Sequence, residues 1–220
     1  MPKLELIAID GPSGAGKSTT AKRVAEALKW DYLDSGAMYR STSLAVHRGG
    51  VDLADRQALE RLLDSLELGQ EGTRIFLNGE DVSEAIRTPE VTRLVTPVSG
   101  DGRVREALVM QQRTIGQRGR WVVDGRDIGT VVFPEACLKV FMVATVEARA
   151  SRRWRELQAK GNPVTLEEVR ADLERRDHAD TTRAVSPLRK ADDALEVDSS
   201  HMNIHEVVDE IVLLYRRLKG

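Results

Sequence analysis

Residues 4–18 read Leu-Glu-Leu-Ile-Ala-Ile-Asp-Gly-Pro-Ser-Gly-Ala-Gly-Lys-Ser. The first part, Leu4 to Ile9, is nearly continuously apolar, which is typical of a strand buried on both faces of a parallel sheet. The segment from Gly11 to Ser18, here called the phosphate loop, matches G-x-x-x-x-G-K-S/T in full and opens a helical stretch. Glycines let backbone N–H groups turn toward phosphate oxygens, a helix N-terminus favours anions, and the lysine reaches the terminal phosphates. The stretch therefore predicts a nucleoside-triphosphate site, with Ser18 supplying a hydroxyl for Mg²⁺.

Further short apolar runs predict four more strands, at residues 32–33, 121–123, 138–144 and 194–197. Helical stretches separate them, at roughly 17–29, 37–48, 102–118, 146–160 and 204–218. Strands that alternate with helices of this length predict βαβ units. We therefore expect an α/β fold with a P-loop core and a five-stranded parallel sheet.

One segment interrupts this alternation. Residues 74–77 run into Asn78-Gly79 and a second short run, which is a strong signal for an antiparallel hairpin. We therefore expect a small inserted module at 62–98 and a P-loop core formed by 1–61 and 99–220. A helical lid is predicted at about 150–165, where Gly161 and Pro163 suit a hinge.

Composition excludes several classes of protein. The chain has 220 residues, with 33 Lys and Arg, 35 Asp and Glu and a formal net charge of −2, whereas nucleic-acid binders usually carry a basic balance. A single cysteine, Cys137, and four scattered histidines predict neither a disulfide nor a multi-ligand metal site. The N-terminal apolar run is too short for a signal peptide or a bilayer span. We expect a cytoplasmic protein with no membrane or nucleic-acid partner, and a monomer because the apolar stripe at 204–215 is best explained by core packing.

A triphosphate site alone serves switches, motors and kinases. No N-K-x-D segment of the kind used by small GTPases follows 138–144, and the chain is short for a motor with a lid domain. Instead, Ser35 and Arg40 follow the second predicted strand, and Arg126 and Asp127 follow the third, where α/β proteins bind ligands. Because two anionic nucleotides repel each other, a kinase that joins them needs several such cations.

The motifs occur in an order that resembles the bacterial cytidylate kinases of the nucleoside monophosphate kinase group. They include I-A-I-D-G-P-S-G-A-G-K-S-T at 7–19, L-D-S-G-A-M-Y-R at 33–40 and D-G-R-D-I-G-T-V-V-F-P at 124–134. Shorter matches lie at 79–91, 104–108 and 183–188, so the resemblance covers essentially the whole chain. Gly102-Arg103 departs from the family, which commonly has proline before the segment at 104–108. An enlarged monophosphate-binding module, known in these kinases, corresponds to the hairpin insertion.

The resemblance implies an ATP-dependent kinase that transfers the γ-phosphate of ATP to CMP or dCMP, with Mg²⁺, in pyrimidine nucleotide metabolism. It implies that the catalytic residues are Lys17, Arg126, Arg153 and Arg176. It implies that the ATP contacts are Gly11, Pro12, Ser13, Gly14, Ala15, Gly16, Lys17, Ser18, Thr19 and Arg149. It implies that the CMP contacts are Ser35, Tyr39, Arg40, Thr96, Arg105, Arg126, Asp127, Arg176, Asp180 and Arg183. Ser99 is the alternative to Thr96 as the hydroxyl that reads the base.

Chemistry supports the cytosine assignment independently. Cytosine presents an amino donor beside acceptors, which suits the carboxylate of Asp127 paired with the guanidinium of Arg105, whereas uracil presents a carbonyl that a carboxylate repels. Two alternatives stay open: a kinase for another small acceptor such as UMP or shikimate, and a nucleotide-dependent switch or RNA-binding regulator. The arginines at 149–155 have the alternative of being a solvated helix face.

Overall fold

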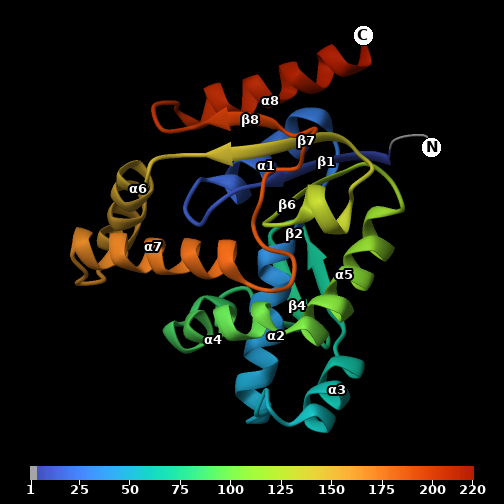
Figure 1. The fold of residues 1–220 in the computed structure, drawn as a ribbon, viewed down its shortest axis with the longest axis vertical. Coiled ribbons are helices and arrows are strands. Elements are labelled where there is room, and N and C mark those ends of the chain that lie inside the picture. Colours follow the sequence, from blue (N-terminus) through green and yellow to red (C-terminus); the bar gives the residue numbers. More distant parts are fainter. Residues whose placement is uncertain (1–3) are drawn as a thin grey trace. The chain divides into compact units, whose positions relative to one another are not determined.

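The computed structural model describes residues 4–220 of the chain (Figure 1). They form two compact units, the first made of residues 4–32 and Gly119–Gly220 and the second of Leu33–Arg118. No helix within residues 4–220 is both long enough and apolar enough to cross a bilayer.

A five-stranded sheet in the order β2-β6-β1-β7-β8 forms the centre of the first unit. Its strands, in that order, are Asp31–Asp34, Trp121–Gly125, Leu4–Asp10, Ala136–Val143 and Leu195–Asp198. β1 pairs in parallel with β6 and β7, and β7 pairs in parallel with β8. The predicted α/β fold with a five-stranded parallel sheet is confirmed, and each strand lies within two residues of its predicted bounds.

One face of this sheet carries the main core of the unit. Ile7 and Ile9 of β1 and Val140 of β7 pack there with α1 (Lys17–Leu28) and α8 (Ile204–Lys219). α8 lies along β7 and β8 (Figure 1). Its buried residues include Val207 and Ile211, as the apolar stripe predicts. Side chains on the opposite face, such as Lys139, meet the short helical segment η2 (Ile128–Val132).

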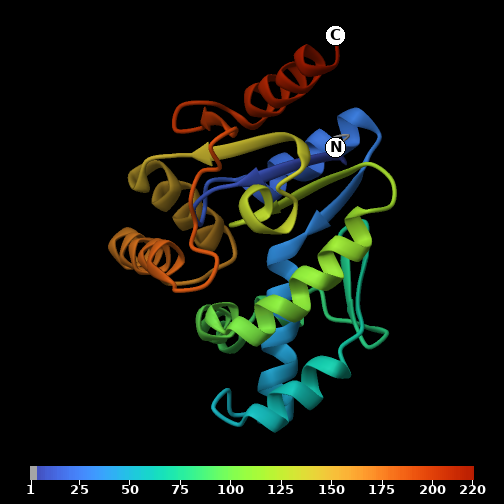
Figure 2. The ribbon, with the colours of Figure 1, turned by 45° about the vertical axis from the view of Figure 1, so that its right-hand side comes forward.

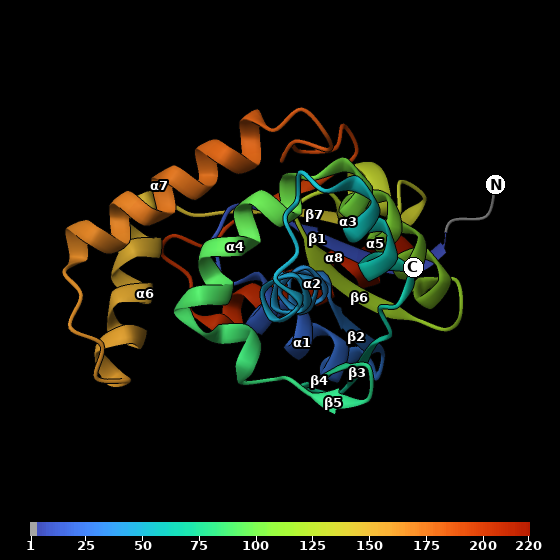
Figure 3. The ribbon, with the colours of Figure 1, turned by 90° about the horizontal axis from the view of Figure 1, so that it is seen from below.

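Two helices of the first unit form an antiparallel hairpin, here called the α6–α7 hairpin. α6 (Val146–Ala159) and α7 (Leu166–Thr182) lie side by side (Figure 3). Ala150, Val169 and Leu173 form a small core between them. The predicted capping box at the start of α7 is confirmed, because Thr165 and Glu168 cap each other's backbone N–H groups. The range predicted for the lid, about 150–165, includes most of α6 and the turn that follows it. That this segment moves stays a prediction.

The second unit combines helices with a small antiparallel sheet. Its helices are α2 (Ser35–Gly49), α3 (Arg56–Asp64), η1 (Ala85–Arg87), α4 (Pro89–Gly100) and α5 (Gly102–Gly116). Its strands are β3 (Leu68–Glu71), β4 (Arg74–Leu77) and β5 (Glu80–Asp81). Asn78 and Gly79 turn the chain between β4 and β5 with φ angles of 50° and 81°, so the predicted hairpin is present.

The second unit extends beyond the segment 62–98 that sequence reasoning set apart. α4 packs on α2 and on α5, and α3 packs on α5, so helices on both sides of that segment join it in one compact unit (Figure 2, where α4 and α5 are green and α2 is blue). The bounds of the second unit are set by packing between helices that are distant in sequence. The hairpin signal concerns only neighbouring residues, so it could not indicate these bounds. The division of function at 62–98 stays a prediction.

Candidate active site

The phosphate loop joins β1, which ends at Asp10, to α1, which begins at Lys17. All three of its glycines have positive φ angles that another residue would adopt only with strain, and Gly11 and Gly16 lie at the two ends of the turn. Gly11 has a φ of 149°, and a Cβ there would lie 2.1 Å from the backbone oxygen of Met142. Gly16, the residue before α1, has a φ of 89°. The strand, the glycine-rich turn and the helix N-terminus therefore have the backbone arrangement that the motif predicts, and the binding of a phosphate there stays a prediction.

Lys17 is buried at the start of α1, with 5% of its surface exposed. Its Nζ donates a hydrogen bond to the backbone oxygen of Pro12 at 2.7 Å. Burial, followed by the positive charge of Arg126, lowers the pKa of Lys17 to about 7. A polyanion in the phosphate loop would favour the charged ammonium, so the residue suits a phosphate chain.

Ser18 is tied to a carboxylate at the end of β6. Its Oγ donates to Oδ2 of Asp124 at 2.8 Å, and the hydroxyl of Tyr32 donates to Oδ1 of the same carboxylate at 2.8 Å. Asp124 is 3% exposed. Within residues 4–220 no group of three or more His, Cys, Asp or Glu could hold a metal. One hydroxyl beside one carboxylate still fits Mg²⁺, which usually takes one or two carboxylates and completes its shell with water and phosphate oxygens.

Asp124 is absent from the residues to which sequence reasoning gave a role in the site. The available signal was its position as the first residue of the D-G-R-D segment directly after a buried strand. Tyr32 gave no such signal, because it lies more than ninety residues away from Asp124 in the sequence.

Asp10 is a second residue that sequence reasoning missed. Its Oδ1 accepts the N–H of Ile128 at 2.8 Å and its Oδ2 accepts the N–H of Gly129 at 2.7 Å. Burial raises the pKa of Asp10 to about 6, although these two backbone hydrogen bonds act in the opposite direction. The carboxylate therefore joins the strand that leads into the phosphate loop to the segment that follows Asp127.

The structure brings together most of the charged residues predicted after β6 and on α7. Nε of Arg126 donates to Oδ2 of Asp180 at 2.7 Å. Arg183 lies 3.6 Å from Asp180 and 3.8 Å from Asp127. Asp180 raises the pKa of Arg126 against the effect of burial. Burial, followed by the charge of Arg126, lowers the pKa of Arg176. We call Arg126, Asp127, Arg176, Asp180 and Arg183 the arginine cluster.

Three of the arginines of α6 have different environments. Arg149 is 6% exposed and bonds to Ser13 and Asp177. Arg152 bonds to the backbone oxygens of Ser199 and Ser200. Arg153 is exposed and pairs with Glu156 at 3.0 Å. The interpretation as a solvated face is therefore wrong for Arg149 and Arg152, whereas the choice between a solvated face and a lid role stays a prediction for Arg153.

The remaining predicted substrate residues lie in the second unit. Ser35 is the buried first residue of α2. Arg40 donates to Oγ1 of Thr92 at 3.2 Å and to the backbone oxygen of Ile86 at 3.4 Å.

Arg105, on α5, is 2% exposed. Its guanidinium lies 5.2 Å from the ring centre of Tyr39, and its Nη1 donates to the backbone oxygen of Ser99 at 3.0 Å. The Ser99 hydroxyl donates in turn to the backbone oxygen of the exposed Thr96 at 3.2 Å. Tyr39, Thr96, Ser99 and Arg105 thus form one connected group.

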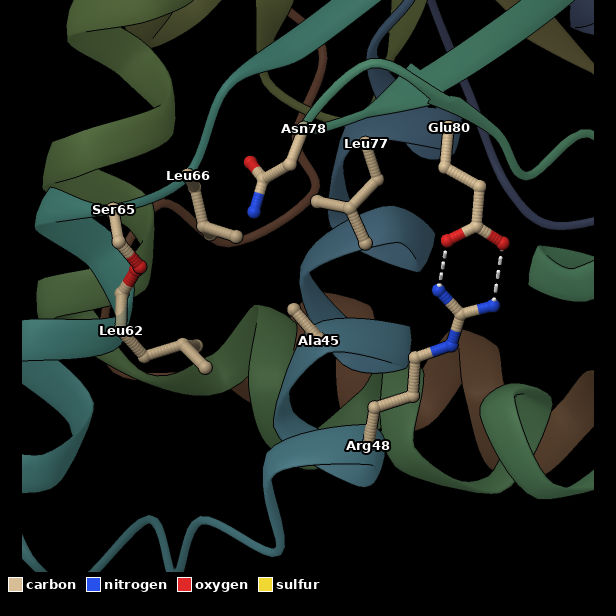
Figure 4. A pocket seen from close by; sticks show the side chains of 8 residues that line it. All are labelled: Ala45, Arg48, Leu62, Ser65, Leu66, Leu77, Asn78 and Glu80. Atoms are coloured by element: carbon tan, nitrogen blue, oxygen red, sulfur yellow. Dashed lines mark hydrogen bonds and ion pairs between the residues drawn. The ribbon is translucent and has the colours of Figure 1, made fainter.

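A pocket of about 260 Å³ lies elsewhere in the second unit (Figure 4). It is lined by Ala45, Arg48, Leu62, Ser65, Leu66, Leu77, Asn78 and Glu80. None of the predicted site residues lines it. Its two charged side chains pair with each other, because Arg48 donates to both carboxylate oxygens of Glu80 at 2.7 and 2.9 Å. This exposed pair satisfies the charges at the rim, so we assign no ligand to the pocket.

Comparison with known proteins gives consistent matches. Residues 7–217 match the family model described as cytidylate kinase. The cytidylate kinase of Carboxydothermus hydrogenoformans is 49% identical over 215 residues, which cover 96% of this chain and 97% of that protein. The bifunctional pantoate ligase/cytidylate kinase of Synechococcus sp. (strain JA-2-3B'a(2-13)) is 49% identical over 224 residues, which cover 99% of this chain and 41% of that protein.

The chain thus spans less than half the length of the bifunctional relative and nearly the full length of the other. A solved structure, that of an uncharacterized protein from Eubacterium ventriosum, matches with a TM-score of 0.51 and 12% identity, covering 98% of this chain and 99% of that one. At that identity the match concerns the fold alone.

Proposed function

The chain belongs to the cytidylate kinase family, whose members are ATP-dependent phosphotransferases, and on that premise we propose that it transfers the γ-phosphate of ATP to CMP, giving ADP and CDP. We include dCMP as a second acceptor. The observation that carries the proposal is the charge arrangement in the first unit. The positive charge of Arg126 helps to lower the pKa of Lys17 in the phosphate loop. Arg126 is held in the arginine cluster by its hydrogen bond to Asp180. A group of cations beside a triphosphate loop suits the transfer of phosphate between two anions.

In this proposal the phosphate loop binds the triphosphate of ATP. Backbone N–H groups of the phosphate loop hold the phosphate oxygens, except at Pro12, which has no N–H, and at Ser13, whose N–H donates to Asp177. Thr19 and Arg149 complete the set of ATP contacts, and Lys17 neutralises charge on the transferred group. Ser18 and Asp124 would hold Mg²⁺ on the side of the loop where their hydrogen bond now lies. When bound, the ion supplies positive charge to the phosphate oxygens.

The contacts proposed for CMP follow the motifs along the chain. In the first unit, Arg126 takes its phosphate and Arg176 neutralises the phosphates during transfer. Asp180 and Arg183 take the ribose, and Asp127 accepts from the cytosine amino group. In the second unit the proposed contacts are Ser35, Tyr39, Arg40, Thr96 and Arg105. The burial of Arg105 and Asp127, 2% and 3% exposed, supports a role for them in reading the base, because a buried polar group discriminates strongly against a base that leaves it without a partner.

No side chain needs to act as a nucleophile. A CMP phosphate oxygen attacks the γ-phosphorus of ATP, the bond to the β-phosphate oxygen breaks, and ADP leaves. Lys17, Arg126, Arg153 and Arg176 contribute by positioning the two nucleotides and neutralising the charge that spreads over the transferred group.

A coupled ADP-release assay with a panel of acceptors tests the proposal. We expect CMP and dCMP to stimulate ADP formation well above UMP, AMP, GMP or shikimate. Each hydrogen bond that CMP makes and UMP cannot make should lower kcat/KM for UMP roughly 5- to 150-fold. Equal rates with UMP and CMP would contradict the cytosine assignment, and ADP release that no acceptor stimulates would favour a nucleotide-dependent switch.

We also propose that the protein acts in the cytoplasm as a monomer, without a membrane or nucleic-acid partner. The apolar stripe of α8 supports the monomer because its main residues, Val207, Val208 and Ile211, are buried within the first unit. Light scattering after size-exclusion chromatography tests this, and a mass of twice 24.4 kDa would contradict it.

A further inference from the structure

The peptide groups on both sides of Ser13 are held by one buried ion pair. The N–H of Ser13 donates to Oδ1 of Asp177 at 3.2 Å, and its backbone oxygen accepts from Nη1 of Arg149 at 2.8 Å. The same Nη1 donates to Oδ2 of Asp177 at 2.6 Å. The Arg149 side chain is 7% exposed and that of Asp177 is 20% exposed. A residue in the middle of the phosphate loop is thus fixed by side chains more than 130 residues away in the chain.

The two side chains come from different helices of the α6–α7 hairpin. Arg149 lies near the start of α6, where its Nε also donates to the backbone oxygen of Ala144 at 3.0 Å. Asp177 lies near the end of α7. Their meeting at Ser13 therefore attaches the base of the hairpin to the phosphate loop at one point.

Side chains of the hairpin also border the next residue of the loop. A Cβ placed on Gly14, whose φ is 76°, would lie 3.4 Å from the Leu173 side chain and 3.5 Å from Cβ of Arg149. Leu173 belongs to the small core between α6 and α7. The charge pair therefore links the loop to the hairpin, and hairpin side chains border the loop at Gly14.

We propose that Arg149 and Asp177 form a positioning pair that sets the conformation of the phosphate loop and keeps it in register with the arginines of the α6–α7 hairpin. In this account Arg149 acts on ATP through the Ser13 peptide. The hinge of the hairpin lies at this pair, and Arg153 and Arg176 move about it. The expected change in kcat rests on the proposed function, whereas the expected change in the conformation of the phosphate loop does not.

The chemistry of the pair explains why both members are needed. Asp177 alone can accept the Ser13 N–H, but a buried carboxylate without a counter-charge is costly. Arg149 alone can donate to the Ser13 oxygen, but its guanidinium would be buried without an anion. Lysine at position 149 keeps the charge but cannot donate from fixed planar positions to Ala144, Ser13 and Asp177 at once.

The test compares Asp177→Asn, Arg149→Lys and the double variant with wild type. Glu174→Gln is the matched control, because Glu174 is an exposed α7 residue whose partner, Arg170 at 3.0 Å, lies on the same helix. Hydrogen exchange of the peptide covering 11–18 is measured without nucleotide, and the dissociation constant of ATP with Mg²⁺ is measured without CMP. Neither measurement depends on turnover of CMP, so a failure of the proposed function leaves this test intact.

We expect exchange in the phosphate loop to accelerate about 10-fold or more in each single variant, with β6 and β7 unchanged. ATP affinity should fall about 10-fold, and kcat about 100-fold if the hairpin arginines are misplaced by an ångström. The double variant should lose no more than the worse single variant, because the two residues act as one unit. The control should match wild type.

Unchanged loop exchange and ATP affinity in both single variants would overturn the proposal, as would losses that multiply in the double variant. One measurement on the wild type stands even if the variants fail to fold. The Ser13 N–H should exchange far more slowly than the amide of an exposed loop, since its hydrogen bond to Asp177 must open before it can exchange. A Ser13 N–H that exchanges as fast as an exposed loop would contradict the pairing.

Discussion

Burial governs the chemistry of single residues around the phosphate loop. Lys17 and Asp10 lie at its two ends, 5% exposed each, and their pKa values move toward each other, to about 7 and about 6. Burial shifts both pKa values toward the neutral forms because it penalises charge. A bound triphosphate would reverse this for Lys17, so the lysine is poised to respond to substrate.

Replacing Lys17 with Met should remove the charge directed at the transferred phosphate while keeping similar bulk. We expect kcat to fall by at least about 100-fold with the fold intact. Steady-state kinetics at saturating ATP and CMP measures this, and a thermal melt checks folding. A folded Lys17→Met enzyme with near-wild-type kcat would remove Lys17 from the mechanism.

Asp10 should make stability depend on pH in a defined window. Its pKa is about 6 in the folded chain against an ordinary 3.8, so between these values the folded state holds a proton that the unfolded state has lost. The stabilising contribution is complete below about pH 4 and is lost as the pH rises through about 6, and it amounts to about 3 kcal/mol.

Urea unfolding of wild type and Asp10→Asn at about pH 4 and pH 7 measures this contribution. The free energy of unfolding of wild type should fall relative to that of the variant by about 3 kcal/mol over the interval. Parallel pH profiles for the two proteins would show that Asp10 titrates at its ordinary value.

At the scale of elements, local patterns predicted helices and strands well and side-chain partners poorly. The apolar runs and the Thr165–Glu168 capping box lie within a few residues of the observed bounds. In contrast, Arg149, Arg152 and Arg153 have helical spacing that says nothing about Ser13 or Ser199, which meet them only through the fold. Sequence reasoning therefore placed α6 correctly. It could not distinguish the arginines of α6 that bond to other segments from those that are exposed.

The exposed arginine gives a test of the α6–α7 hairpin as a lid. If the hairpin closes over ATP, Arg153→Ala should lower the single-turnover rate of phosphoryl transfer well beyond its effect on CMP binding without ATP, because the contact forms only in the closed state. Arg155→Ala, an exposed arginine on the same helix, is the control. Rates for Arg153→Ala within a factor of about three of wild type would lie under about 1 kcal/mol apart and return the residue to a solvated face.

At the scale of the whole molecule, the order of motifs predicted the parallel sheet and the position of the phosphate loop. It did not predict the second compact unit, Leu33–Arg118. The bounds of this unit depend on the packing of α2 and α5 with the segment 62–98, which lies between them in the sequence. Most of the candidate site follows predicted strands and could be found in advance. Asp124 offered one signal, its place directly after a buried strand. Asp10 and Asp177 could not be found, since each acts through a hydrogen bond to a residue far along the chain.

The central claim is that phosphate passes from ATP to CMP, and labelled ATP tests it most directly. Wild-type protein is incubated with ATP labelled at the γ-phosphate, CMP and Mg²⁺, and the products are separated by chromatography. The label should appear in CDP in the same amount as the ADP that forms, and Lys17→Met should reduce it about 100-fold or more. Label that appears only in inorganic phosphate, or ADP formation that CMP does not increase, would contradict the account.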